Sequence, residues 1–148
     1  MSEAPFILRR QVEFNHCDPA GMVFYPRFFE MISATIERFL GDAVGYGWDG
    51  MAITSGGRGT PMGQIDVRFE APAFLGDWLE FRLTVARIGT ASATFTIACH
   101  GAEDRKFLCH ATIVHADTGG GRSVPWPEAA REGMARYLSD DTEEKMTA

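Results

Sequence analysis

The sequence predicts a single α+β domain in which an antiparallel sheet of about five strands wraps around one long buried helix. One stretch near the N-terminus, residues 25–40, carries apolar residues at helical spacing. Four later stretches between residues 65 and 117 alternate apolar and polar residues, as strands with one buried face do. These strands follow one another without intervening helices, which favours α+β over a doubly wound fold.

Length and composition also fit one globular domain. The chain has 148 residues, of which 45% are apolar and 23% are charged. A chain of this size buries roughly 68–70% of its unfolded surface. We assign residues 1–139 to the domain and expect residues 140–148 to be a disordered tail.

Charge and cysteine content restrict the partners and the compartment. The net charge of −6 argues against nucleic acid, because phosphate contacts need a basic surface. Three cysteines without close pair spacing predict a reducing, cytoplasmic compartment. We find no signal peptide, and no apolar stretch approaches the ~20 residues that span a bilayer, so we expect no membrane partner.

The first predicted strand covers residues 6–14 and leads into a loop at residues 15–23. Leu8, Val12 and Phe14 fall on one face of this strand. The loop contains Asp18-Pro19-Ala20-Gly21, which is typical of a tight turn. An acid held in a turn before an apolar helix is a candidate reaction centre.

The long helix is expected over residues 25–40. Pro26 suits its first position, and Gly41 is the expected stop. The apolar face is broad, so the helix should be largely buried. Its apolar residues recur at spacings of three and four: Phe28, Ile32, Ile36, Phe39 and Leu40.

The rest of the chain predicts mainly sheet. A glycine-rich region at residues 42–63 allows one short helix near residues 42–52 and a loop at residues 56–59. Short connections make the four strands that follow an antiparallel meander. A short amphipathic helix is expected around residues 128–138.

Three segments resemble the 4-hydroxybenzoyl-CoA thioesterase family of hotdog-fold proteins. They are Val12–Phe28 (VEFNHCDPAGMVFYPRF), Gly59-Thr60-Pro61 with the following strand, and Arg122–Pro127. The expected element order matches a hotdog over almost the whole chain. The resemblance implies an enzyme that hydrolyses an acyl-CoA thioester, with the active site across a homodimer interface and dimers that often pair into tetramers.

The same resemblance implies roles for residues of the first segment. Asp18 matches the catalytic carboxylate, as nucleophile or general base, and the backbone N–H of Tyr25 polarises the thioester carbonyl. A helix N-terminus offers unpaired N–H groups and a positive dipole end, which suit a developing oxyanion. Tyr25-Pro26 follows the hydroxybenzoyl-CoA pattern and favours an aromatic acyl group. His16 departs from the pattern, because an acidic residue often stands two positions before the catalytic Asp.

Binding residues are less sharply indicated. Thr60 is a candidate for lining the site, and Arg87 and Arg122 are candidates for the coenzyme A phosphates. The alternative for each arginine is a solvated surface side chain. His16-Cys17-Asp18 lacks metal-ligand spacing, so we expect no metal and no cofactor beyond the coenzyme A of the substrate.

Two other functions stay open at this point. A hotdog enoyl-CoA hydratase or dehydratase has a similar fold but releases no thiol. A non-catalytic acyl-CoA-binding module would leave the thioester intact. The sequence also leaves open the acyl group, coenzyme A versus acyl-carrier protein, and dimer versus tetramer.

Overall fold

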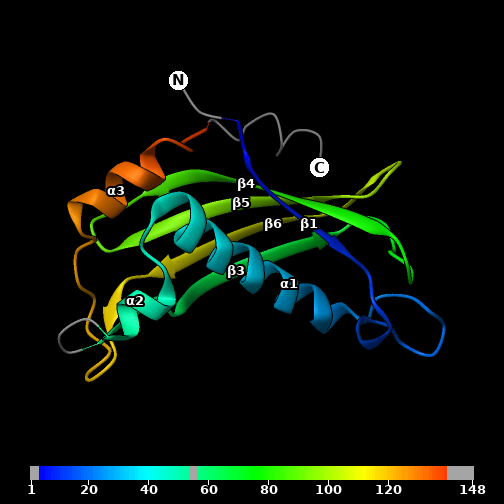
Figure 1. Cartoon of the computed structure of the whole chain (residues 1–148), viewed down its shortest axis with the longest axis horizontal. Coiled ribbons are helices and arrows are strands. Elements are labelled where there is room, and N and C mark those ends of the chain that lie inside the picture. Colours follow the sequence, from blue (N-terminus) through cyan, green and yellow to red (C-terminus); the bar gives the residue numbers. More distant parts are fainter. Residues whose placement is uncertain (1–3, 54–56, 140–148) are drawn as a thin grey trace.

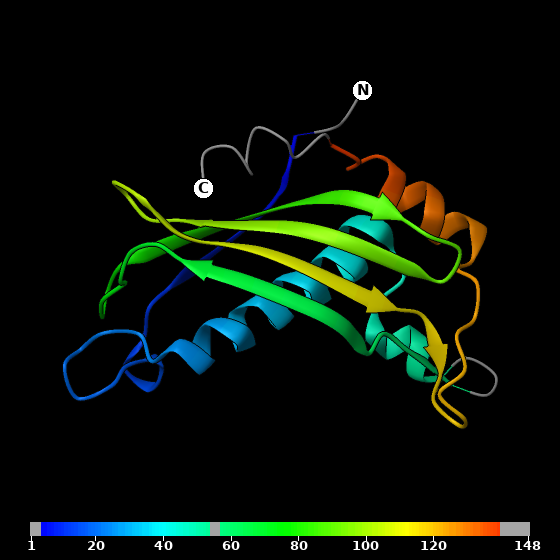
Figure 2. The same cartoon turned by 180° about the vertical axis from the view of Figure 1, so that it is seen from behind.

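One long helix crosses one face of an antiparallel sheet in the computed structural model, which describes residues 4–53 and 57–139. This helix is α1 (Tyr25–Arg38), and the sheet has five strands (Figure 1). Figure 2, seen from behind, shows the sheet in front of α1, so the helix covers a single face. The α+β architecture predicted from the sequence is confirmed. The predicted tail, residues 140–148, lies outside the described residues.

The strand order of the sheet differs from a simple meander. It is β1-β4-β5-β6-β3, so only β4, β5 and β6 follow one another, and β3 pairs with β6. The predicted four-strand meander is therefore wrong for β3. The position beside β4 is taken by β1, which hydrogen-bonds along it from Phe6 opposite Leu83 to Gln11 opposite Trp78. The strands are β1 (Phe6–Gln11), β3 (Met62–Phe69), β4 (Trp78–Ile88), β5 (Ser92–His100) and β6 (Arg105–Val114).

The core lies between α1 and the sheet. The inward side chains of the sheet include Phe81, Leu83, Phe95, Ile97 and Phe107, all fully buried. Each such side chain contributes about 1.5–3 kcal/mol of burial free energy. The far face of α1, with Glu30, Glu37 and Arg38, is exposed, so the helix is buried along one face only. The buried face of α1 consists of Phe28, Met31, Ile32, Thr35 and Ile36.

The helix does not stop at Gly41. It continues as a π-helical segment, η2 (Phe39–Val44), and ends at Gly45, whose φ of +79° is a left-handed conformation that favours glycine. Phe39 and Leu40 are fully buried, so core packing carries the backbone past the glycine.

The first strand is shorter than predicted. It ends at Gln11, and Phe14–His16 form a 3₁₀ turn, η1. The N–H of Val12 donates to the carbonyl of Asp77, after which the chain turns away from the sheet. Phe14 is consequently 84% exposed, and the prediction that it shares the buried face with Val12 is wrong.

Small elements close the end of the molecule near the C-terminus of α1. Helix α2 (Trp48–Ile53) precedes β2 (Arg58–Gly59), which pairs with β7 (Ala116–Asp117), so Arg58-Gly59 is a short strand and not loop. Helix α3 (Glu128–Ala135) leads back to β4, where the N–H of Val85 donates to the carbonyl of Tyr137. Among the described residues, none of the helices combines the length and the apolar character needed to cross a bilayer.

Candidate active site

The loop around Asp18 is a small, tightly closed hairpin. Cys17 and Val23 form an antiparallel bridge, and the N–H of Asp18 donates to the carbonyl of Met22 at 2.9 Å. The N–H of Gly21 donates back to the carbonyl of Asp18 at 2.9 Å. Gly21 has a φ of +80°, a conformation that other residues rarely adopt. The backbone therefore holds Asp18 at the first position of a closed turn.

Only one of the two carboxylate oxygens of Asp18 accepts hydrogen bonds from the described residues. Its Oδ1 accepts hydrogen bonds from the N–H groups of Ala20, at 2.9 Å, and Met22, at 3.2 Å. Its Oδ2 has no hydrogen-bond partner within residues 4–53 and 57–139. Capping fixes the orientation of this half-buried side chain, and one oxygen stays available for a reaction.

The hairpin ends at the first residue of α1. The N–H of Phe24 donates to the carbonyl of His16 at 3.0 Å, and Arg27 donates to the carbonyl of Phe24 at 2.8 Å. Pro26 has no N–H, and the N–H of Tyr25, at the first helical position, has no partner in the described part of the chain. A single free N–H at the positive end of the helix dipole thus follows the Asp18 hairpin directly.

His16, named from the sequence only as a departure from the family pattern, is buried at the end of the turn before Asp18. Its side chain is 6% exposed, and its Nδ1 accepts the N–H of Glu13 at 2.8 Å. Burial lowers the pKa of His16, and Arg10 lowers it further. The imidazole is therefore a neutral hydrogen-bond acceptor for the turn that directly precedes the Asp18 hairpin.

Aromatic side chains surround this end of α1. Phe69, at the end of β3, lies edge-on to Tyr25 with ring centroids 6.5 Å apart, and 5.9 Å from the ring of Phe28. Phe24, Tyr25 and Phe69 are 50%, 60% and 45% exposed. An apolar surface therefore adjoins the free N–H.

Neither buried thiol is a nucleophile at neutral pH. Burial raises the pKa of Cys109 to about 12, and burial raises that of Cys99 still further. Cys17 is half-buried and its thiol donates to the carbonyl of Glu13. Among the described residues no group of three or more His, Cys, Asp or Glu is placed to hold a metal ion.

The structure brings Asp18 and Tyr25 together but places Thr60 at the opposite end of α1. Phe69 contacts Tyr25, whereas Thr60 lies beyond the other end of β3, an eight-residue strand of about 26 Å. Thr60 is half-buried, and its Oγ1 accepts a hydrogen bond from Trp48 Nε1 at 2.8 Å. Because the indole can only donate, the Thr60 hydroxyl hydrogen is available to another acceptor.

The two arginine candidates also lie at the Thr60 end. Arg87 is near the end of β4, the strand that begins at Trp78 beside the Asp18 hairpin, and Arg122 follows β7. Both are exposed, and neither guanidinium bonds to any described residue. Within one chain, the five predicted residues therefore form two groups at opposite ends of the molecule.

A buried polar centre at the Thr60 end was not predicted. His115 is 1% exposed, its Nδ1 lies 2.7 Å from the carbonyl of Val124, and its Nε2 lies 2.7 Å from the hydroxyl of Tyr46. Nδ1–H therefore donates to the carbonyl, and Tyr46 donates to Nε2. His115 also stacks on Trp126 at 4.7 Å. Burial raises the pKa of Tyr46, although Arg58 acts to lower it.

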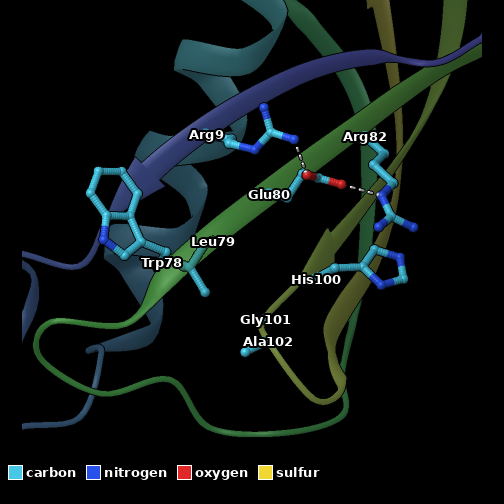
Figure 3. A pocket seen from close by; sticks show the side chains of 8 residues that line it. All are labelled: Arg9, Trp78, Leu79, Glu80, Arg82, His100, Gly101 and Ala102. Atoms are coloured by element: carbon cyan, nitrogen blue, oxygen red, sulfur yellow. Dashed lines mark hydrogen bonds and ion pairs between the residues drawn. The ribbon is translucent and has the colours of Figure 1, made fainter.

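A hollow of about 200 Å³ opens on the sheet face away from α1, and none of the five predicted residues lines it (Figure 3). Glu80 bridges two guanidinium groups there, with Arg9 at 2.8 Å and Arg82 at 2.7 Å. Figure 3 shows the His100 ring beside Arg82. These are partly exposed ion pairs of the kind that contribute about 0–1 kcal/mol each.

Comparisons with known proteins agree on one family. The model of the thioesterase-like superfamily matches residues 12–134. A 1,4-dihydroxy-2-naphthoyl-CoA thioesterase from Synechocystis is 22% identical, with 88% of this chain and 95% of that chain covered and a TM-score of 0.79. A gentisyl-coenzyme A thioesterase is 20% identical over 87% and 99% of the chains, with a TM-score of 0.77.

A third solved structure, a Staphylococcus aureus protein in complex with CoA, is 13% identical over 93% and 85% of the chains, with a TM-score of 0.84. These likenesses establish a shared fold. No curated protein matches the sequence significantly. The family model spans most of the chain, and the chain therefore belongs to the thioesterase-like superfamily, whose members are thioester hydrolases with the hotdog fold.

Proposed function

We propose that this thioester hydrolase cleaves an acyl-coenzyme A, with Asp18 as nucleophile or general base and the N–H of Tyr25 as oxyanion donor. One observation carries the proposal: a rigid backbone hairpin joins a carboxylate with one free oxygen to the free N–H of the first residue of α1. Thioester hydrolysis needs these two groups on either side of one carbonyl.

The overall reaction consumes one water. Water oxygen, delivered directly or after attack by Asp18, ends on the acyl carbon, the C–S bond breaks, and the sulfur leaves with its electron pair and takes up a proton. Negative charge that develops on the carbonyl oxygen is stabilised by the Tyr25 N–H and the helix dipole. Coenzyme A enters only as part of the substrate, and the proposed chemistry requires no metal or other cofactor.

An aromatic acyl group of the 4-hydroxybenzoyl type is the proposed substrate class. The exposed rings of Phe24, Tyr25 and Phe69 support it, because aromatic rings favour stacked or edge-on contact with one another. Two structural relatives are named for aromatic acyl-CoA substrates, 1,4-dihydroxy-2-naphthoyl-CoA and gentisyl-CoA. The relative with bound CoA supports coenzyme A as the carrier.

A homodimer formed along β3 is the proposed assembly, alone or paired into a tetramer. β3 is an edge strand, and six of its eight residues are exposed. A long unpaired edge readily pairs with another strand. Two β3 strands in antiparallel register would place Phe69 of one chain near Met62 of the other.

Such a dimer would complete the site. Thr60 of the partner subunit, two residues before Met62, would approach the Asp18 hairpin of the first chain. The partner's arginines at positions 87 and 122 would lie at the same end, where coenzyme A phosphates need cations. The separation of Asp18 from Thr60 within one chain supports this shared site. A cytoplasmic location stays a prediction from the cysteine content.

The test measures thiol release from aromatic and aliphatic acyl-CoA esters by wild type and Asp18→Asn. Asparagine keeps an oxygen for the turn N–H groups but removes the charge, so we expect a rate about 10²–10⁴-fold lower. Undiminished turnover would exclude Asp18 as the catalytic group. A hydratase or a binding module would release no thiol from any ester.

Asp77 supplies the matched control. Its Oδ2 caps the N–H of Phe74 at 2.9 Å, so it is a turn-capping Asp at the same end of the molecule. Asp77→Asn should keep thiol release within about threefold of wild type, because asparagine keeps an oxygen for the Phe74 N–H and Asp77 has no role in the proposed reaction. Equal losses in Asp18→Asn and Asp77→Asn would mean that Asp18 is merely a turn residue.

A further inference from the structure

His16 directly precedes the proposed catalytic hairpin, and the proposed mechanism does not use its side chain. It ends the 3₁₀ turn η1, two residues before Asp18, and is 6% exposed. Its backbone carbonyl accepts the N–H of Phe24, the residue directly before the oxyanion donor. His16 therefore contacts the segment before Asp18 and the segment before Tyr25 at once.

The imidazole has a defined tautomer. Nδ1 accepts the Glu13 N–H at 2.8 Å, so Nδ1 carries a lone pair and, in the neutral ring, the hydrogen is on Nε2. A proton added to Nδ1 would face the hydrogen of the Glu13 N–H and break this bond. The turn that places the His16 carbonyl under Phe24 would then lose its side-chain anchor.

We propose that His16 is a positioning residue. Its neutral ring keeps the Asp18 carboxylate aligned with the Tyr25 N–H, and protonation of the ring removes this alignment. The inference rests on the proposed function of Asp18 and Tyr25. It adds a group that switches the site off in acid without touching the substrate.

The surroundings of His16 set the direction of its titration. Burial acts most strongly and lowers the pKa, Arg10 on β1 and Arg27 on α1 lower it too, and Glu13 in its own turn and Glu30 on α1 raise it. The net effect holds the pKa of His16 below its usual value of 6.5. The neutral ring is therefore present at neutral pH, and the alignment of Asp18 with the Tyr25 N–H is lost as pH falls through the pKa of His16.

Substitution separates this role from simple packing. His16→Ala removes the acceptor, and a small misplacement of reacting groups lowers kcat by about 10- to 100-fold. His16→Asn provides an amide oxygen for the Glu13 N–H and cannot be protonated near pH 6. We expect His16→Asn to recover much of the kcat lost in His16→Ala, with KM little changed in both, because the ring does not bind the substrate.

The decisive readout is the pH profile of kcat. Wild type should lose activity at a higher pH than His16→Asn, which has no imidazole to protonate at this position. His100→Asn, the same substitution on the other face of the sheet, is the matched control and should keep the wild-type limb (Figure 3). Superimposable acid limbs for wild type and His16→Asn would overturn the proposal.

A second measurement works without any turnover. In wild type, the NMR signals of the His16 ring and of the Glu13 and Phe24 amides should shift with one common midpoint below pH 6.5. Independent titration of the Phe24 amide would overturn the proposal even if both variants fail to fold. If the three signals share one midpoint but the protein hydrolyses no acyl-CoA, then protonation of His16 is coupled to the Phe24 segment and only the proposed function is rejected.

Discussion

The two ends of α1 are built in opposite ways. At the Asp18 end, one carboxylate oxygen and one N–H lack partners in the described chain, and the rings of Phe24 and Tyr25 are half exposed. At the Thr60 end, four buried or half-buried polar side chains are paired internally: Tyr46 with His115, and Trp48 with Thr60. The Asp18 end thus presents polar groups that lack partners, whereas the Thr60 end is braced, in the sense that side-chain hydrogen bonds hold it together.

The proposed site, divided between two copies of the chain, would use both kinds of end. The open end supplies charge and a polarising donor, and the braced end can present a pre-oriented hydroxyl, because Trp48 already occupies the Thr60 oxygen as donor. Pre-orientation reduces the entropy lost when a transition state forms. In the proposed shared site neither end is complete alone, and antiparallel pairing of β3 would bring one of each together.

A hybrid dimer tests whether each active site is shared between two chains, and it should give the largest expected effect. Asp18→Asn should lower activity by about 10²–10⁴-fold, and Thr60→Val by about tenfold for one lost hydrogen bond. A hybrid of one chain of each kind, isolated with two different tags, contains one intact site and one doubly altered site if sites are shared. Its rate of thiol release should be about half that of wild type.

The alternative gives a clearly lower rate. If each chain carried a whole site, the hybrid would hold one site without Asp18 and one without the Thr60 hydroxyl, and its rate would stay near a twentieth of wild type, given a tenfold loss for Thr60→Val. Each variant tagged twice and purified as its own dimer is the control for the tags. A hybrid rate at this low level would refute the shared site.

The second-largest expected effect is on the free energy of unfolding, which variants at the two ends should change by different amounts. His115→Ala leaves the Tyr46 hydroxyl without its acceptor and opens a cavity beside Trp126, so it should lower the free energy of unfolding by about 2–4 kcal/mol. Phe14→Ala removes a larger ring at the Asp18 end, yet Phe14 is 84% exposed and the change should stay within about 0.5 kcal/mol. Urea denaturation at one protein concentration measures both.

Tyr46→Phe is the matched control for His115→Ala, because it removes the same hydrogen bond without a cavity. It should cost about 1 kcal/mol. If His115→Ala and Phe14→Ala cost the same, the Thr60 end is not braced by its polar centre.

The periodic elements of the fold followed from the sequence, and the pairing of strands did not. Alternation identifies β3, β4, β5 and β6, but it is the same for every strand of a one-sided sheet. It therefore carries no information on whether β3 or β1 lies beside β4. That choice depends on the hydrogen bonds of β1 along β4, which leave β6 as the partner of β3.

The site divides in the same way. Asp18 and Tyr25 could be proposed from the sequence because their motif is local, and the hairpin that joins them is closed by neighbouring residues. His115 lies 69 residues from Tyr46, so no local pattern joins them. One signal was present: His115 continues the inward alternation of Cys109, Ala111 and Ile113 along β6, which directs its ring into the core. No comparable signal marks His16, which is buried only because the chain turns at η1.

Lowering the pH should have the smallest of the expected effects, and it should act on stability at the Asp18 end only. At the Asp18 end, Glu70 forms a two-point ion pair with Arg105, at 2.6 and 2.8 Å, and the hydrogen bond from Arg105 lowers the pKa of Glu70. A carboxyl with a lowered pKa stabilises the fold above its usual pKa of 4.5 and loses that contribution as pH falls through the lowered value. The polar pairs of the Thr60 end, Tyr46–His115 and Trp48–Thr60, contain no carboxylate.

Arg105→Gln should therefore lower the free energy of unfolding by about 1 kcal/mol at pH 7, and the difference from wild type should shrink as pH falls through the lowered pKa of Glu70. Glu70→Gln should show the same loss, and the double variant little more than either single variant, because both remove one interaction. Native-state hydrogen exchange at pH 7 and pH 4 then locates the effect. The amides of residues 65–70 should exchange faster in acid relative to their intrinsic rates, whereas those of residues 111–116 should not. Equal acceleration at both ends would mean that acid loosens the whole sheet, and the contrast between an ion-paired end and a neutrally braced end would fail.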